Sequence, residues 1–277
     1  MSAQIIIDST VDLRPELLSE VKVARLSILF GSETYVDGKT LTKQEFYTKL
    51  VSSDVLPTTS QATPFVFSEL YKETIEEGNE AVVITISSKL SGTFQSANIA
   101  SMDYEGKVYV VDSLNAAIGA GVLAEFAIRL AKVGLSAKQI YNILEEEKHN
   151  VCLIALLDTL DYLHRGGRLD KKSAIIGNLA KVKPIIYVSP KGFVEMYSKT
   201  IGLKKSMKFI LNVALENEVD TNYPFYSIYT YGTENPEKFE AIAKECGIEV
   251  TDRVQFGPVV GTHCGPEAYG CIYISKK

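Results

Sequence analysis

Short apolar runs alternate with amphipathic segments through the first half of the chain. The runs lie at residues 5–7, 81–86 and 108–111, and segments with helical spacing follow at about 93–100 and 115–133. Strands without polar alternation are typical of parallel sheets, because helices cover both faces of such sheets. The pattern therefore predicts a βαβα order and an α/β fold.

Particular residues predict two helix N-termini and a small excursion of β structure, made of two short strands. Thr42 precedes a Glu by three residues and Ser136 precedes a Gln by three, which is the spacing of a capping box. Residues 22–36 have the composition of two short strands, and the Asp37-Gly38 pair that follows predicts their turn.

From Val151 the pattern changes. An apolar run begins there, a helix start is indicated at Asp170, and Pro190-Lys191-Gly192 is typical of a hairpin turn. Further elements are predicted as a helix over 203–216, a strand over 225–232, a helix over 236–247 and closing strands over 248–260 and 267–275. The expected fold is thus a Rossmann-like parallel sheet lobe over residues 1–151 and an α+β lobe with a largely antiparallel sheet over 152–277.

The composition is that of an ordinary globular protein, with 46% hydrophobic and 23% charged residues. The formal net charge of −5 offers no basic surface to a nucleic-acid backbone, so nucleic acid is not an expected partner. No apolar run approaches the roughly 18 residues that span a bilayer, and the N-terminus has no leader pattern. We expect a cytoplasmic protein without a transmembrane segment.

The cysteines do not follow a metal-binding or redox pattern. Their spacing matches neither a CxxC pair nor paired zinc ligands; they are Cys152, Cys246, Cys264 and Cys271. Cys264 and Cys271 lie near His263, but Cys271 belongs to an apolar segment, which favours a buried thiol. We expect free thiols and no metal site.

Ser91-Gly92-Thr93 lies where an apolar run ends and a helical segment begins. A helix N-terminus presents free N–H groups and a positive dipole end, and nearby hydroxyls add donors, so the position suits an anion. The alternative is an ordinary N-cap. The hydroxyl-rich loop at 56–63 leaves the same two interpretations open, because Thr59 and Ser60 could bind an anion or the loop could serve as successive helix caps.

His263 and Arg168 lie in glycine-rich segments. His263 stands in GPVVGTHCGP, where it could donate to a carboxylate or phosphate, or satisfy a buried turn. Arg168 follows a Gly-Gly pair and could face an acidic group or remain solvated beyond a helix end. The Asp8-Ser9-Thr10 and Asp112-Ser113 segments end two predicted parallel strands, where ligands of open α/β sheets bind, although both could cap helices.

Common enzyme signatures are absent from the sequence. There is no nucleophile elbow, Walker loop, dinucleotide fingerprint, zinc-protease motif or kinase set. Ser91 and His263 with an Asp could still form a triad, because triads are recognised by geometry rather than by order. A hydrolase or phosphatase acting on an acyl or phosphate ester is therefore the alternative function.

Six segments in this order resemble the DegV family: IIIDSTVDL, TTSQ, SSKLSGTFQSA, VVDS, LDTLDYLHRGGRL leading into IGNLAKVKPII, and GPVVGTHCGP. The resemblance implies a two-lobed, non-catalytic lipid-binding protein. It would hold one long-chain fatty acid, such as palmitate, between its lobes and need no other cofactor. In bacterial members such a carrier presents the carboxylate to a separate fatty acid kinase, which makes the acyl phosphate.

By the same resemblance, Thr59, Ser91 and His263 would bind the fatty acid carboxylate. Residues of the same motifs are additional candidates, namely Ser60, Gly92, Thr93, Thr262 and Arg168. The chain departs from the family after the second-lobe hairpin, where many members have Arg and this sequence has only Lys199, Lys204 and Lys205. This departure puts coupling to a kinase in question more than lipid binding.

Overall fold

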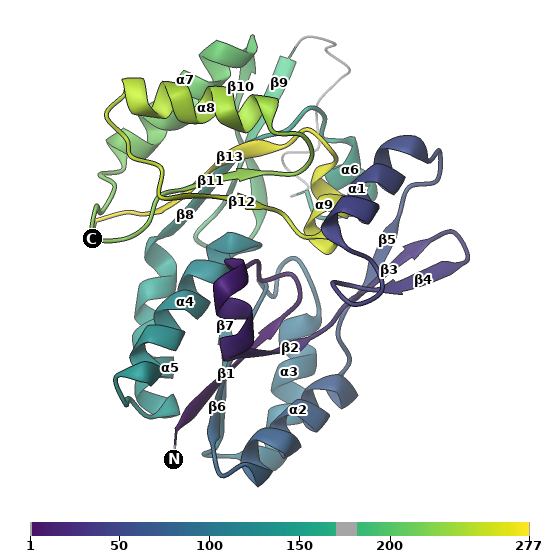
Figure 1. Ribbon diagram of the computed structural model, residues 1–277, viewed down its shortest axis with the longest axis vertical. Coiled ribbons are helices and arrows are strands. Elements are labelled where there is room, and N and C mark those ends of the chain that lie inside the picture. Colours follow the sequence, from purple (N-terminus) through teal and green to yellow (C-terminus); the bar gives the residue numbers. More distant parts are fainter. Residues whose placement is uncertain (1, 170–181, 277) are drawn as a thin grey trace.

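Parallel strands form the first sheet of the protein, whose computed structural model describes residues 2–169 and 182–276 (Figure 1). In spatial order they are β2 (Val21–Ala24), β1 (Ala3–Asp8), β6 (Glu80–Thr85) and β7 (Val108–Asp112). Ile5 of the central β1 lies opposite Val21 on one side and Val82 on the other. The predicted Rossmann-like parallel sheet is confirmed.

Helices cover both faces of this sheet (Figure 1). They are α2 (Pro64–Glu76) and α3 (Thr93–Ser101) on one face, and α4 (Ile118–Lys132) and α5 (Ala137–Glu147) on the other. Ile6 packs with the α2 and α3 core, whereas its neighbours Ile5 and Ile7 pack with the α4 and α5 core. Because successive strand residues point to opposite faces and both faces are covered, these strands are apolar throughout.

Both predicted capping boxes are present. The Thr42 hydroxyl accepts from the backbone N–H of Glu45 at the start of α1 (Lys43–Ser52), and the Glu45 carboxylate accepts from Thr42. Ser136 makes the same reciprocal pair with Gln139 at the start of α5. The local sequence therefore determines where these two helices begin.

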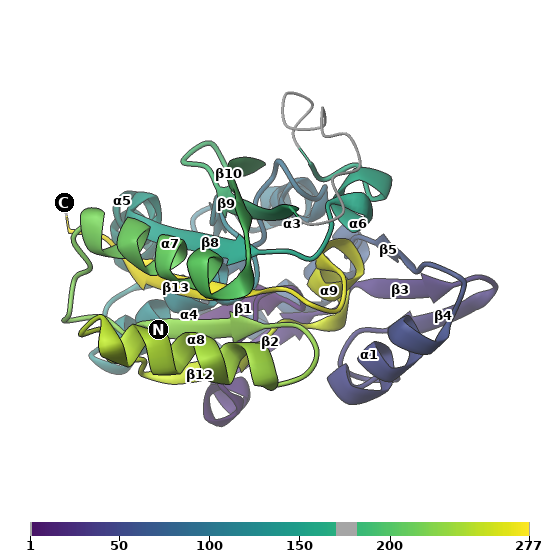
Figure 2. The ribbon, with the colours of Figure 1, turned by 90° about the horizontal axis from the view of Figure 1, so that it is seen from above.

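A small antiparallel sheet projects from the side of the molecule together with α1 (Figure 2). Its strands, in spatial order, are β4 (Glu33–Val36), β3 (Ser27–Phe30) and β5 (Thr58–Ser60). The excursion of β structure was expected, and a turn does form at Asp37-Gly38, where the Lys39 N–H donates to the Val36 carbonyl at 3.1 Å and Gly38 has a φ of 61°. This turn follows β4, however, and does not join the two strands. Phe30 pairs with Glu33, so the chain turns at Gly31, whose φ of 59° suits a two-residue hairpin loop.

Asp37 is a buried carboxylate beside this sheet. It is 2% exposed, and within the described chain its Oδ2 atom has no hydrogen-bond partner. Burial raises its pKa to about 7, and the nearby Asp12 adds to this rise; a hydrogen bond from Ser9 and the charges of Lys43 and Arg25 lower it. The folded protein therefore holds a proton that the unfolded chain releases near pH 4.

Asp37→Asn is expected to become progressively more stabilising, relative to the wild type, from about pH 4 to about pH 7, and constant above. The reason is that the wild-type folded state loses stability as pH rises through this window, whereas the amide has no proton to lose. The total change is on the order of 4 kcal/mol. Urea unfolding at several pH values measures it, with the exposed Asp54→Asn as control; parallel stability curves for Asp37→Asn and the wild type would contradict it.

The second sheet is mixed and largely antiparallel, as predicted. In spatial order its strands are β10 (Val194–Ile201), β9 (Val182–Val188), β8 (Val151–Leu156), β13 (Tyr269–Ile274), β11 (Tyr226–Tyr229) and β12 (Asp252–Gln255). Only β11 and β12 pair in parallel among these strands. The expected hairpin joins β9 and β10, with Gly192 at φ 83°.

The two faces of the second sheet have different neighbours. Helices α7 (Leu203–Glu216) and α8 (Glu234–Glu245) cover the outer face, where Ile154 and Cys271 join their core (Figure 1). The inner face, including Leu153 and Ile272, shares a core with helix α4, which packs on the first sheet. The inner face and the first sheet thus enclose the space in which a ligand site can form.

Short helices complete the structure. They are α6 (Asp161–Arg165), α9 (Pro258–Cys264) and the 3-10 helices Pro15–Glu20, Met102–Tyr104 and Lys148–Asn150. The strand predicted over 248–260 is partly wrong, because the chain leaves β12 at Gln255 and Pro258 opens α9, a position where its missing N–H costs nothing. The helix start expected at Asp170 lies outside the described residues. The second sheet begins at Val151, and the division of the chain into lobes at this point stays a prediction.

Candidate functional site

A cavity of about 410 Å³ lies between the two sheets. The first half of the chain contributes Ile86, Leu90 and Ala116 to its wall, and the second sheet contributes Leu153 and Ile186. Its volume falls in the range of small-molecule sites. The cavity is therefore the candidate ligand site.

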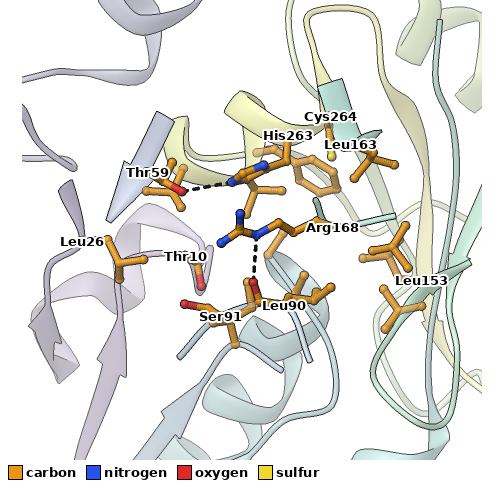
Figure 3. A pocket seen from close by; sticks show the side chains of 18 of the residues that line it. Thr10, Leu26, Thr59, Leu90, Ser91, Leu153, Leu163, Arg168, His263 and Cys264 are labelled. Carbon is orange, nitrogen blue, oxygen red and sulfur yellow. Dashed lines mark hydrogen bonds between the residues drawn. The ribbon is translucent and has the colours of Figure 1, made fainter. Parts of the chain in front are cut away.

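The polar residues of the cavity gather toward one side (Figure 3). Thr10, Thr59 and Ser91 lie there, and the Arg168 side chain reaches in among them. Leu153 stands on the side away from Thr59 (Figure 3). This division suits a molecule with an anionic head and a long apolar tail.

Thr59 and His263 meet across 204 residues of sequence. The Thr59 Oγ1 atom, on β5, lies 3.0 Å from Nε2 of His263, on α9. The other ring nitrogen of His263, Nδ1, is buried and has no hydrogen-bond partner in the described structure. Gly166 lies against Nδ1 so closely that a Cβ at this position would overlap it.

His263 is neutral at neutral pH. Burial, and secondly the charge of Arg168, lower its pKa to about 4. A neutral imidazole carries one ring proton, and a proton on Nδ1 would be a buried donor without an acceptor. Protonation at Nε2 costs less, and Nε2 then donates to Thr59. The hydroxyl hydrogen of Thr59 is thereby free to be donated into the cavity.

Ser91 is not the N-cap of α3, because Gly92 occupies that position and makes no side-chain cap hydrogen bond. The Ser91 hydroxyl lies 2.8 Å from Oγ1 of Thr93 and accepts from the Thr93 N–H at the start of α3. It also lines the cavity. Gly92 has no room for a side chain, because the Gln61 carboxamide lies over it and donates to the Gly92 carbonyl.

Arg168 supplies positive charge to the polar side of the cavity. Its Nε donates to the Leu90 carbonyl at 3.1 Å and its Nη1 to the Gly166 carbonyl. Within residues 2–169 and 182–276 no carboxylate pairs with it. Two backbone carbonyls hold the guanidinium in place.

Not all predicted residues reach the cavity. Thr59, Ser60, Ser91, Arg168 and His263 line it, whereas Gly92, Thr93 and Thr262 do not. The buried Thr262 hydroxyl donates instead to the carbonyl of Pro258, within its own helix.

Two further residues, Thr10 and Gln61, complete the polar side. Thr10 belongs to the Asp8-Ser9-Thr10 segment, which was expected either at a ligand site beyond the carboxyl end of a parallel strand or as a helix cap, and it lines the cavity. Asp8 accepts from the Thr10 hydroxyl and from the N–H of Ile86, and burial raises the pKa of Asp8 to about 6 despite these bonds. Gln61 lines the cavity from the TTSQ loop, where only the hydroxyls were expected to bind an anion.

The geometry does not assemble a hydrolase triad. The partner of His263 is Thr59, and the partner of Ser91 is Thr93. No carboxylate in the described chain accepts a hydrogen bond from Nδ1 of His263, where the third member of a triad would stand. The described residues also contain no group of three or more His, Cys, Asp or Glu side chains arranged for a metal ion.

None of the helices in the described chain is both long and apolar enough to cross a membrane.

The family model described as "Uncharacterised protein, DegV family" matches residues 2–276. The DegV domain-containing protein TTE1491 of Caldanaerobacter subterraneus is 34% identical over 278 residues, covering 98% of each chain.

Solved structures of similar proteins cover the whole chain. A DegV family protein from Thermus thermophilus, described for its fatty acid binding, has a TM-score of 0.89 at 29% identity, with 100% of both chains covered. A stearic acid-binding protein from Eubacterium ventriosum has a TM-score of 0.89 at 26% identity, covering 99% of this chain and 98% of its own. The chain belongs to the DegV family.

Proposed function

We propose that the protein binds one long-chain fatty acid in the cavity between its sheets. The division of this cavity into a polar side and an apolar wall is the observation that carries the proposal. Thr59, Ser91 and His263 form the carboxylate site, and Arg168 supplies a compensating charge. Similar proteins described as binding fatty acids, including stearic acid, support the same ligand class.

The acyl tail supplies most of the affinity. Burial contributes about 0.8 kcal/mol per methylene, so a long chain contributes on the order of 10 kcal/mol before the costs of association. A hydrogen bond to a charged group contributes about 1.5–3 kcal/mol. The head-group residues therefore orient the ligand and select an acid over an ester, which would leave buried donors unsatisfied.

We also propose that the protein presents this carboxylate to a fatty acid kinase in the cytoplasm, and that it performs no catalysis itself. A second hollow of about 350 Å³ shares Thr59, Arg168 and His263 with the cavity. The hollow leaves the carboxylate end accessible to a reactant from outside. Lys199 on β10 and Lys204 and Lys205 at the start of α7 retain positive charge there but lack the bidentate geometry of Arg.

Organic extraction of the purified protein followed by mass spectrometry is expected to yield about one fatty acid per chain, because a buried tail dissociates slowly. Protein stripped of lipid should rebind an added fatty acid. A protein that is purified without lipid and does not bind added fatty acid would contradict the proposal. Turnover of an acyl ester that Ser91→Ala abolishes would instead favour the hydrolase alternative.

A further inference from the structure

A second cavity, of about 210 Å³, adjoins the apolar side of the first. Leu153 of β8 and Val188 of β9 line both cavities, so these two residues lie at the boundary between them. They are 4% and 7% exposed. Leu153 also lies on the side of the first cavity away from Thr59, where the tail of a bound acid would end (Figure 3).

Most polar side chains around the second cavity are engaged with protein partners. Asn115 donates to the carbonyl of Val151 at 3.0 Å, and Lys148 pairs with Glu145 at 2.9 Å. Asn217 donates to the Tyr273 hydroxyl at 2.8 Å. The remaining wall includes the apolar side chains of Leu114, Ile154 and Val213. The buried Ser189 hydroxyl is the exception, because it has no hydrogen-bond partner in the described chain. The rest of this wall can accept methylenes.

We propose that Leu153 and Val188 set the longest acyl chain that the protein accepts, and that the second cavity receives distal methylenes when this wall is reduced. The inference rests on the proposed fatty acid binding. Each buried methylene tightens binding about fourfold (about 0.8 kcal/mol). Affinity should therefore rise with chain length until the tail meets the wall and then stop rising.

The chain contains a matched control for Val188. Val194 pairs with Val188 across the β9–β10 hairpin, is equally buried at 7% exposure, and lines the first cavity only. Val188→Ala and Val194→Ala remove the same atoms from the first cavity, but only Val188→Ala opens a path into the second. Leu153 and Leu163 form a second such pair, since Leu163 lines only the first cavity.

Dissociation constants of the four alanine variants and the wild type for straight-chain saturated acids, from lauric to behenic, test the inference. Val188→Ala is expected to extend the rise in affinity by about two methylenes, which is roughly 16-fold for the longest acids. Leu153→Ala should do the same, whereas Val194→Ala and Leu163→Ala weaken binding without moving the optimum. Thermal unfolding of each variant establishes that it is folded.

If Val188→Ala and Val194→Ala bind the same acyl chain length most tightly, Leu153 and Val188 do not limit chain length. This conclusion would hold even if both variants bind shorter acids normally. A wild type that binds no acid of any length would overturn the proposed function and this inference together. The two failures are therefore distinguishable in the same experiment.

Discussion

The affinity for a long-chain fatty acid is expected to fall by roughly 100-fold when Thr59 and Ser91 are both replaced by alanine. Each hydroxyl faces the cavity and is the proposed donor to the carboxylate. Losing two charge-assisted hydrogen bonds costs about 3 kcal/mol or more, because the carboxylate must then remain buried against fewer donors. The tail contacts are untouched, so binding is weakened and not abolished.

Displacement of a fluorescent fatty acid measures this loss. The methyl ester of the same acid should bind the double variant at least as tightly as it binds the wild type, because the variant lacks the donors that an ester leaves unsatisfied. Thr48→Ala with Ser52→Ala is the matched control, since these exposed α1 hydroxyls bond only to carbonyls of their own helix. An unchanged acid-to-ester ratio in the cavity variant would refute the head-group assignment.

The parts of the fold that could be predicted are those specified by local residues. The apolar run around Ile5 predicts a strand buried on both faces, and the hydroxyls of Thr42 and Ser136 mark helix starts through contacts three residues away. The hairpin turn near Gly31 was missed because Asp37-Gly38 is a stronger turn signal than Gly31-Ser32. Both turns form, but the pairing of Phe30 with Glu33 places the hairpin loop at Gly31-Ser32, and the Asp37-Gly38 turn follows the second strand.

The polar side of the site was easier to predict than its apolar wall. Hydroxyls and a histidine in glycine-rich segments stand out in a sequence, and Thr59, Ser91 and His263 all line the cavity. Leu153 and Val188 could not be selected, because cavity-lining and core side chains have the same composition. Their role depends on which empty space each one borders, and only the packed structure defines that.

The close approach of Gly166 to His263 leads to the second large effect. Gly166→Ala is expected to lower fatty acid affinity by about tenfold or more, since the added methyl overlaps Nδ1 and displaces the ring from Thr59. The backbone at Gly166 is right-handed helical, with φ of −72°, so alanine causes no conformational strain there. The loss would thus come from the position of the imidazole.

The adjacent glycine provides the control for this effect. Gly167 has a φ of 66°, and a Cβ added there would meet no other atom of the described chain within 4 Å, so Gly167→Ala should cost about 1 kcal/mol of stability without moving His263. Isothermal titration and thermal unfolding of both variants separate the two causes. In a His263→Ala background, Gly166→Ala should have little further effect on affinity, because the ring it displaces is gone. A full tenfold loss in that background would show that Gly166 acts on the ligand site by another route.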